Sequence, residues 1–126
     1  MKAGDTFRPA GGTVDRFVHL WVVISDPEQD SDEVLIVSLT EYHPKKDTAC
    51  ILEPGDHPFI HKRTCVAYDL ANAPSLDDLM QARENGDLIP NEPMPPEVLE
   101  RIRKQSSLST KMEPDLCDIL DRQGLV

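Results

Sequence analysis

The sequence predicts a β-rich α+β fold, in which a small closed barrel or tightly coiled sheet is followed by short helices. The main indication is a pair of apolar, β-branched segments, residues 19–25 and 34–40, separated by the acidic loop 26–33. Further short strand-like segments with glycine- and proline-rich turns continue to residue 70, as in small barrels. From residue 75 the pattern becomes helical, so we expect the main helices near the C-terminus.

The expected strands are apolar segments bounded by turn signals. Gly4-Asp5 bends the first strand, and the proline and glycines of residues 8–16 indicate a loop before the second. Residues 43–47 and 53–58 form turns, the latter fixed by its prolines. The predicted strands are residues 2–7, 17–25, 33–39, 48–52 and 64–70.

Three short helices are expected in the second part of the chain. Ser75 is a suitable N-cap and Gly86 a suitable stop for the first helix. A proline pair opens the second, over residues 95–106, and Pro114 opens the third. Residues 88–90 are interpreted as a connector. Each of the last two helices has one apolar side, which either packs on the β layer or forms a surface for a second copy of the chain or a partner protein. These sides are formed by Val98, Leu99, Ile102, Leu116, Ile119 and Leu120.

Length and composition narrow the classes of protein. With 126 residues we expect one domain over 1–126, mainly β in 1–70 and mainly helical in 71–126. The net charge of −10 disfavours non-specific binding to nucleic acid. The longest apolar run, residues 20–24, is too short to cross a membrane, and the N-terminus lacks a secretory pattern. Three cysteines far apart in the sequence favour reduced thiols, so we expect a cytoplasmic protein without a membrane partner.

Five short motifs follow one another along the chain. They are Gly4-Asp5, the glycine-rich loop 11–16, the strand 19–25, the segment Ser38-Leu39-Thr40-Glu41, and Thr64-Cys65-Val66 leading to Asp69. In this order they resemble the MazF/PemK toxins of type II toxin–antitoxin systems, which have the CcdB-like fold and a closing C-terminal helix. The resemblance covers nearly the whole chain. It implies an SH3-like β-barrel of about five to seven strands.

The resemblance implies a toxin-like endoribonuclease that cleaves single-stranded RNA through attack by the 2′-OH, without a metal or other cofactor. It also implies a homodimer and an antitoxin protein as partner, and the apolar sides of the last two helices are the candidate surface for either. Such cleavage needs a group that accepts or positions the hydroxyl proton, and a donor or cation for the charge on phosphate. In the family, the arginine of an Arg-Pro pair and the threonine of a Pro-Leu-Thr-Ser segment fill these roles.

Thr40 matches the family threonine, but His19 and Leu20 stand where the family has Arg-Pro. An imidazole can act as acid or base near neutral pH, although it lacks the bidentate fork of a guanidinium. Arg16, three residues earlier, is a second candidate for contacting the phosphate. The predicted catalytic residues are therefore Thr40, His19 and Arg16, in a site that is either active, retuned or dead.

Two basic clusters are candidates for RNA binding, namely Lys45 with Lys46 and Lys62 with Arg63. They serve this role if the strands bring them near Thr40, and otherwise they belong to solvated turns.

The histidines and cysteines offer candidates for a metal site and for a thiol site. His57, His61 and Cys65 are spaced by four residues, but Pro58 argues against the helix that would align them, and zinc needs about four ligands. The sequence favours the simpler interpretation that these histidines are surface residues near a turn, and we expect no metal. A cysteine–histidine hydrolase using Cys65 and His57 has no supporting sequence context, so Cys65 is expected to be structural.

A function from a different class stays open, namely a catalytically inactive SH3-like barrel that acts as a protein-binding or regulatory module. The missing Arg-Pro, Glu41 in place of a family hydroxyl, and the charge of −10 favour it. Gyrase poisoning, as in the CcdB branch, ranks last because the end of this chain lacks the tryptophan that the branch uses. The fold does not decide among these functions.

Overall fold

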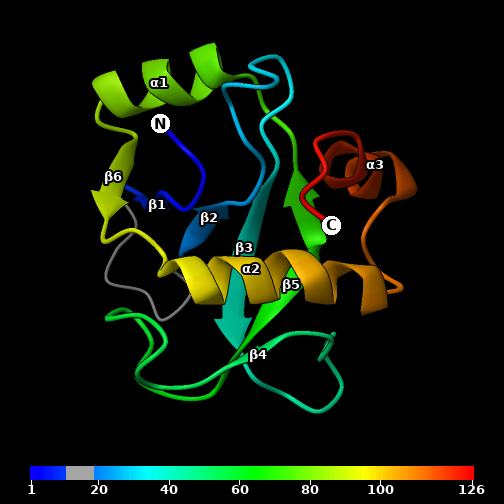
Figure 1. Cartoon of the computed structure of the whole chain (residues 1–126). Helices are drawn as coiled ribbons and strands as arrows, with labels where there is room; N and C mark the ends of the chain where they lie inside the picture. The colour runs from blue at the N-terminus through cyan, green and yellow to red at the C-terminus, as the bar shows by residue number, and fades with distance from the viewer. Residues whose placement is uncertain (11–18) are drawn as a thin grey trace.

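A computed structural model of the chain describes residues 1–10 and 19–126, which form an antiparallel sheet and three α-helices (Figure 1). The helices are α1 (Leu76–Glu84), α2 (Pro96–Gln105) and α3 (Pro114–Arg122), with a 3₁₀ turn η1 (Ser106–Leu108) after α2. The β-rich α+β class with mainly C-terminal helices is thereby confirmed. The strands are β1 (Thr6–Pro9), β2 (Trp21–Val23), β3 (Ile36–Glu41), β4 (Ile51–Leu52), β5 (Thr64–Asn72) and β6 (Leu88–Asn91).

The hydrogen-bonded order of the strands is β4-β5-β3-β2-β1-β6, and every pairing is antiparallel. Within the described residues β4 and β6 are the two edges, so the sheet is open and a closed SH3-like barrel is not confirmed. β6 covers the residues that the sequence predicted as a connector. It pairs with β1, and its Pro90 is compatible with an edge position because an edge strand does not need every N–H.

The five strands expected from the sequence are all present with shifted bounds, apart from residues 17–18, which lie outside the described part. The predicted helices agree more closely. Ser75 caps α1, its Oγ accepting a hydrogen bond from the backbone N–H of Asp78 at 3.1 Å. Pro96 and Pro114 each occupy the first turn of their helix, where a missing N–H costs nothing.

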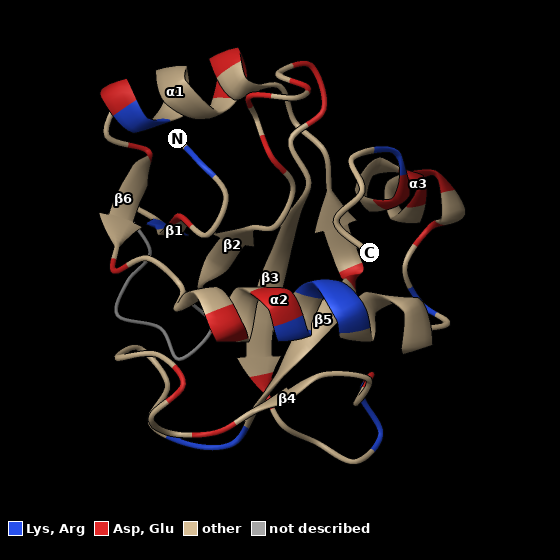
Figure 2. Ribbon diagram, viewed as in Figure 1, with Lys and Arg blue, Asp and Glu red and all other residues tan. Residues whose placement is uncertain are grey.

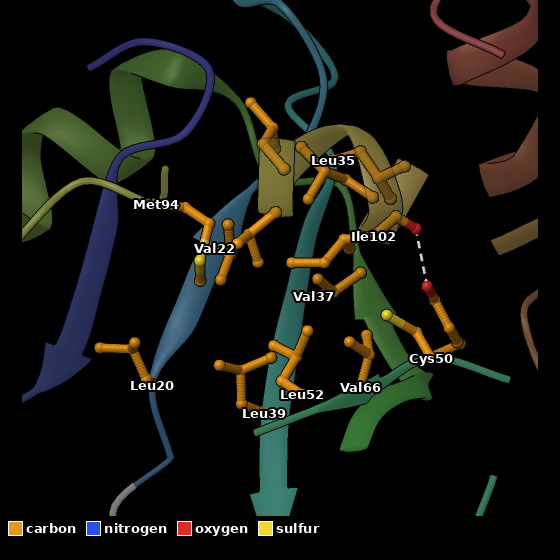
Figure 3. Close-up of a cluster of buried hydrophobic side chains, with 14 of the residues drawn as sticks. Leu20, Val22, Leu35, Val37, Leu39, Cys50, Leu52, Val66, Met94 and Ile102 are labelled. Carbon is orange, nitrogen blue, oxygen red and sulfur yellow. Dashed lines mark hydrogen bonds between the residues drawn. The ribbon is translucent and has the colours of Figure 1, made fainter. Parts of the chain in front are cut away.

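The main core lies between one face of the sheet and the helices α2 and α3. Side chains alternate along the strands, so Leu20, Val22 and Ile24 face this core. Ile102 of α2 packs among the apolar residues of β2, β3 and β5, as Figure 3 shows. The hydroxyl of Tyr68, a buried residue of β5, donates a 2.7 Å hydrogen bond to the carbonyl oxygen of Ile102. The packing of α2 and α3 on the β layer is therefore confirmed.

The second face of the sheet is covered only in part. A small cluster of Phe7, Val23, Val34, Ile36 and Leu79 packs beneath α1. Cross-strand partners share a face, so the pairs Ser38↔Ala67 and Thr40↔Cys65 of β3 and β5 continue this face beyond the cluster. The register between β3 and β5 shifts between Ile36 and Ser38, where the two parts of the face meet. The part around Thr40 lies beside the end of β3 that carries the predicted site.

Gly4 joins the N-terminal turn to the helical layer. Its φ is +90°, and a Cβ there would lie 3.5 Å from Leu99 Cδ2 of α2. Its backbone N–H donates to the carbonyl of Val23, and its carbonyl accepts from the N–H of Met94. The Gly-Asp motif is thus a left-handed turn that docks β1 against β2 and the start of α2. No described helix has the length and apolar character needed to cross a membrane.

Candidate functional site

A cleft of about 360 Å³ opens on the second face of the sheet, where β3 and β5 extend beyond the cluster under α1. It contains four of the residues predicted from the sequence, namely His19, Thr40, Lys45 and Lys46. Thr40 comes from β3, and the two lysines come from the turn that follows it. The remaining lining residues are Asp47, Cys65, Ala67, Asp69, Leu70 and Lys111.

His19 is held by the backbone of the neighbouring strand. Its Nδ1 lies 2.8 Å from the carbonyl oxygen of Leu39. The backbone just before β2 is also paired with β3, because the N–H of Leu39 donates to the carbonyl oxygen of Leu20. A carbonyl oxygen only accepts hydrogen bonds, so Nδ1 must carry the proton. In the neutral ring the lone pair therefore resides on Nε2, and no described residue hydrogen-bonds to this nitrogen.

Lys46 brings a positive charge to Thr40. Its Nζ donates to Thr40 Oγ1 at 2.9 Å and to the carbonyl oxygen of Glu41 at 2.9 Å. The turn itself is closed by the N–H of Lys46, which donates to the carbonyl of His43. An ammonium has three donors, and no third acceptor for Lys46 lies among the described residues, so one of its protons is left for a ligand. Thr40 thus positions a cation in the cleft.

The cleft lysines differ from the other predicted cluster in their ion pairing. Among the described residues, Lys45, Lys46 and Lys111 have no carboxylate within ion-pair distance. Lys62, by contrast, pairs with Glu41 at 3.1 Å, and Arg63 pairs with Glu53 at 2.7 Å.

Lys62 and Arg63 do not line the cleft. The guanidinium of Arg63 lies over the ring of Tyr42, 5.5 Å from its centroid. The structure therefore brings Lys45 and Lys46 to Thr40, but not Lys62 and Arg63.

Cys65 lies in the wall of the cleft as the cross-strand partner of Thr40. It is fully buried, and burial raises the pKa of its thiol, although the nearby Lys46 ammonium opposes this shift. A thiol with a raised pKa is a poor nucleophile near neutral pH, since the thiolate is the reactive form. Its position therefore fits the structural role expected from the sequence.

The other candidates lie elsewhere. His57 is not the surface residue that the sequence indicated, because its side chain is 2% exposed. Its Nε2 lies 2.6 Å from the carbonyl oxygen of Glu92, and its Nδ1 accepts a hydrogen bond from the N–H of Phe59. Both ring nitrogens are thus used to fix the β4–β5 loop, a contact between distant segments that no local pattern signals. Arg16 lies within residues 11–18, outside the described part. In residues 1–10 and 19–126, no three His, Cys, Asp or Glu side chains cluster as metal ligands.

Sequence reasoning did not identify Asp47 and Lys111 as part of the site. Asp47 accepts hydrogen bonds from the N–H of Ala49 at 3.0 Å and from the hydroxyl of Ser109 at 2.5 Å. Lys111 follows this serine, in the segment between η1 and α3. The contact spans 62 positions in the sequence, so no motif or spacing could have indicated it.

Charge is unevenly distributed over the molecule. Figure 2 shows basic segments interleaved with acidic ones in the loops at the β4 end of the sheet, whereas acidic segments predominate in the loop before β3 and in the helices α1 and α3. The cleft lies at this end and combines the ammonium groups of Lys45, Lys46 and Lys111 with the carboxylates of Asp47 and Asp69. An anionic ligand is therefore repelled less here than over the acidic loop and helices.

Comparison with known proteins identifies no relative: no family model, no curated protein and no solved structure matches this chain. The function is therefore argued from the cleft and its residues.

Proposed function

We propose that this protein is an endoribonuclease of the MazF/PemK type that cleaves single-stranded RNA by attack of the 2′-OH, without a metal. The observation that carries the proposal is that His19 Nε2 and Lys46 Nζ serve one cleft, the first with an available lone pair and the second with an available proton. These are the base and the cation that internal RNA cleavage needs.

The chemistry follows from these two groups. Nε2 of His19 takes the proton of the 2′-OH, O2′ bonds to phosphorus, and the P–O5′ bond breaks. The products are a 2′,3′-cyclic phosphate and a 5′-hydroxyl, whose proton comes from solvent. The Lys46 ammonium donates to a non-bridging phosphate oxygen and stabilises the charge that builds there. Thr40 contributes by holding that ammonium in place.

The proposal explains the departure from Arg-Pro noted in the sequence. A guanidinium is a permanent cation and a poor base, whereas His19 with a proton fixed on Nδ1 is suited to accept a proton. The phosphate-binding role then falls to the lysines of the turn. The proposal includes RNA as substrate, and it includes a second copy of the chain and an antitoxin as partners. Closure of the sheet into an SH3-like barrel also remains part of the proposal.

The test uses purified protein and a fluorescently labelled single-stranded RNA in a buffer containing EDTA. We expect discrete fragments with cyclic phosphate ends, identified by mass spectrometry. His19→Asn should strongly reduce the yield of these fragments, because an amide can still donate to the Leu39 carbonyl but offers no base at the Nε2 position. Intact RNA at every protein concentration would contradict the proposal.

Two observations favour the alternative, a catalytically inactive protein-binding module. The Lys46 ammonium already has two internal acceptors, so a phosphate must compete for its remaining proton. Leu70, at the rim of the cleft, is 48% exposed and offers an apolar contact to a protein. Under this alternative the same RNA stays intact, and Leu70→Ser weakens binding to the protein partner.

A further inference from the structure

The segment between η1 and α3 reaches back to the turn that carries Lys45 and Lys46. Ser109 Oγ donates to Asp47 Oδ2 at 2.5 Å, and the N–H of Lys111 donates to Ser109 Oγ at 3.0 Å. One hydroxyl therefore joins the turn and the segment. The other oxygen of Asp47 is held by the N–H of Ala49.

Lys111 is fixed from its other side as well. Met112, the next residue, is 5% exposed and belongs to the main core. Its carbonyl oxygen lies 4.0 Å from the Sγ of Cys117 in α3. The backbone of Lys111 is thus held between a hydrogen bond and a buried side chain, which lowers the backbone entropy that this segment must lose when Lys111 binds a ligand.

The side chain of Lys111 is exposed, lines the cleft and has no carboxylate partner within ion-pair distance among the described residues. The cleft therefore contains ammonium groups from two separate parts of the chain. A ligand with a single phosphate needs one of them, whereas a polyanion with successive phosphates can use both.

We propose that Lys111 binds the RNA phosphate next to the scissile one, and that the Ser109–Asp47 hydrogen bond positions it. The inference rests on the proposed function and extends it, because it makes the substrate of this cleft a strand with at least two successive phosphates. Lys111 acts in binding, and Lys46 in the chemical step. Ser109 is a positioning residue that acts through Lys111.

The experiment measures binding of a labelled oligonucleotide in which each 2′-OH is replaced by hydrogen, so that cleavage cannot occur. Fluorescence anisotropy gives the Kd of the full chain at several salt concentrations. For Lys111→Gln we expect a Kd raised roughly fivefold at low salt. We also expect a slope of log K against log salt that is shallower by about 0.7, the value for one phosphate contact on a single strand.

The matched control is Lys104→Gln, which removes the same charge from α2, where Lys104 pairs with Glu100 at 2.9 Å outside the cleft. Its Kd and slope should equal those of the unsubstituted protein. Equal slopes for Lys111→Gln and Lys104→Gln would overturn the proposal, because a lost phosphate contact must change the slope and a lost surface charge must not.

The positioning role has its own readout. Ser109→Ala should raise the Kd by a smaller factor than Lys111→Gln, and Ser109→Ala combined with Lys111→Gln should bind no more weakly than Lys111→Gln alone. If the two substitutions instead raise the Kd by independent factors that multiply in the double variant, Ser109 does not act through Lys111. If the oligonucleotide binds with the expected slopes but RNA is not cleaved, the proposed nuclease fails while the phosphate contact stands.

Discussion

The carbonyl oxygen of Leu39 accepts a 2.8 Å hydrogen bond from Nδ1 of His19, and this contact determines which nitrogen of the imidazole faces a ligand. Because the acceptor is part of the β2–β3 pairing, the orientation of the ring is set by the sheet itself. A side chain held in this way needs little reorganisation before it acts as a base.

Replacement of His19 tests the base directly. His19→Asn retains a donor for the Leu39 carbonyl and removes the base, so we expect the cleavage rate to fall by about 10²–10⁴-fold with an unchanged thermal unfolding midpoint. Single-turnover assays and calorimetry provide the two measurements. A rate within a factor of about three of the unsubstituted protein would show that another group accepts the proton.

The contact between Thr40 and Lys46 can be separated into its two parts. Lys46→Gln removes the cation, and we expect a rate about 10²-fold lower. Thr40→Val keeps the shape but removes the acceptor of the 2.9 Å hydrogen bond, so a smaller loss is expected. Thr40→Ser keeps the hydroxyl and serves as control. If Thr40→Ser is as slow as Thr40→Val, the hydroxyl is not the positioning group.

The two basic clusters should differ in RNA affinity. Lys45→Gln removes a cation at the cleft that has no ion-pair partner in residues 1–10 and 19–126, and it should weaken oligonucleotide binding. Lys62→Gln removes a cation that is already paired with Glu41 at 3.1 Å outside the cleft, so binding should change little. Anisotropy titrations of both variants at one salt concentration compare them, and the reverse order would place RNA over the Lys62 turn.

Tyr68 links β5 to α2 through its hydroxyl. Tyr68→Phe leaves the buried carbonyl of Ile102 without this donor, so we expect the free energy of unfolding to fall by about 1–2 kcal/mol. Tyr42→Phe is the control, because Tyr42 is only half-buried, and a change within about 0.5 kcal/mol is expected there. Urea unfolding measures both, and equal values would show that the Tyr68 hydroxyl contributes nothing.

Stability should decline at alkaline pH. Burial raises the pKa of the thiols of Cys50 and Cys65, so in this range the unfolded chain releases their protons before the folded protein does. Their contribution is complete below the pKa of an unfolded thiol, and it is lost as pH rises toward the folded pKa values. We expect a smaller free energy of unfolding at about pH 9.5 than at pH 7.

The variant Cys50→Ala/Cys65→Ala checks the origin of this decline. It should be less stable at neutral pH, because two buried side chains are shortened, but it should lose less stability between neutral and alkaline pH. A decline as steep as in the unsubstituted protein would assign the effect to other groups. Burial also raises the pKa of Tyr68, which leaves a residual decline at still higher pH in both proteins.

Local chemistry made the helices predictable. Ser75 and the prolines at 96 and 114 act within one turn of a helix start, and the structure places the starts where these residues indicate. The strand β6 was not predictable in this way, because its residues form a strand through pairing with β1 rather than through propensity.

The candidate site was predictable only where the chain brings neighbours together. Thr40, Lys45 and Lys46 are close in sequence and lie in one cleft, and His19 reaches it from the adjacent strand. Lys111 and the buried His57 depend on contacts between distant segments, and such contacts leave no mark on the local sequence. The order of the strands in the sheet was not predictable either, because it depends on which strands pair and many of these are far apart in the sequence.

The pairing of β6 with β1 has a consequence for synthesis of the protein. One edge of β1 stays unpaired until residues 88–91 are made, and the apolar face of the sheet stays exposed until Ile102 and the helix that follows are made. A nascent chain emerging from the ribosome thus exposes Val22, Val37 and their neighbours until its C-terminal helices arrive. Folding is therefore expected to occur late in translation, with partial chains as clients of chaperones and proteases.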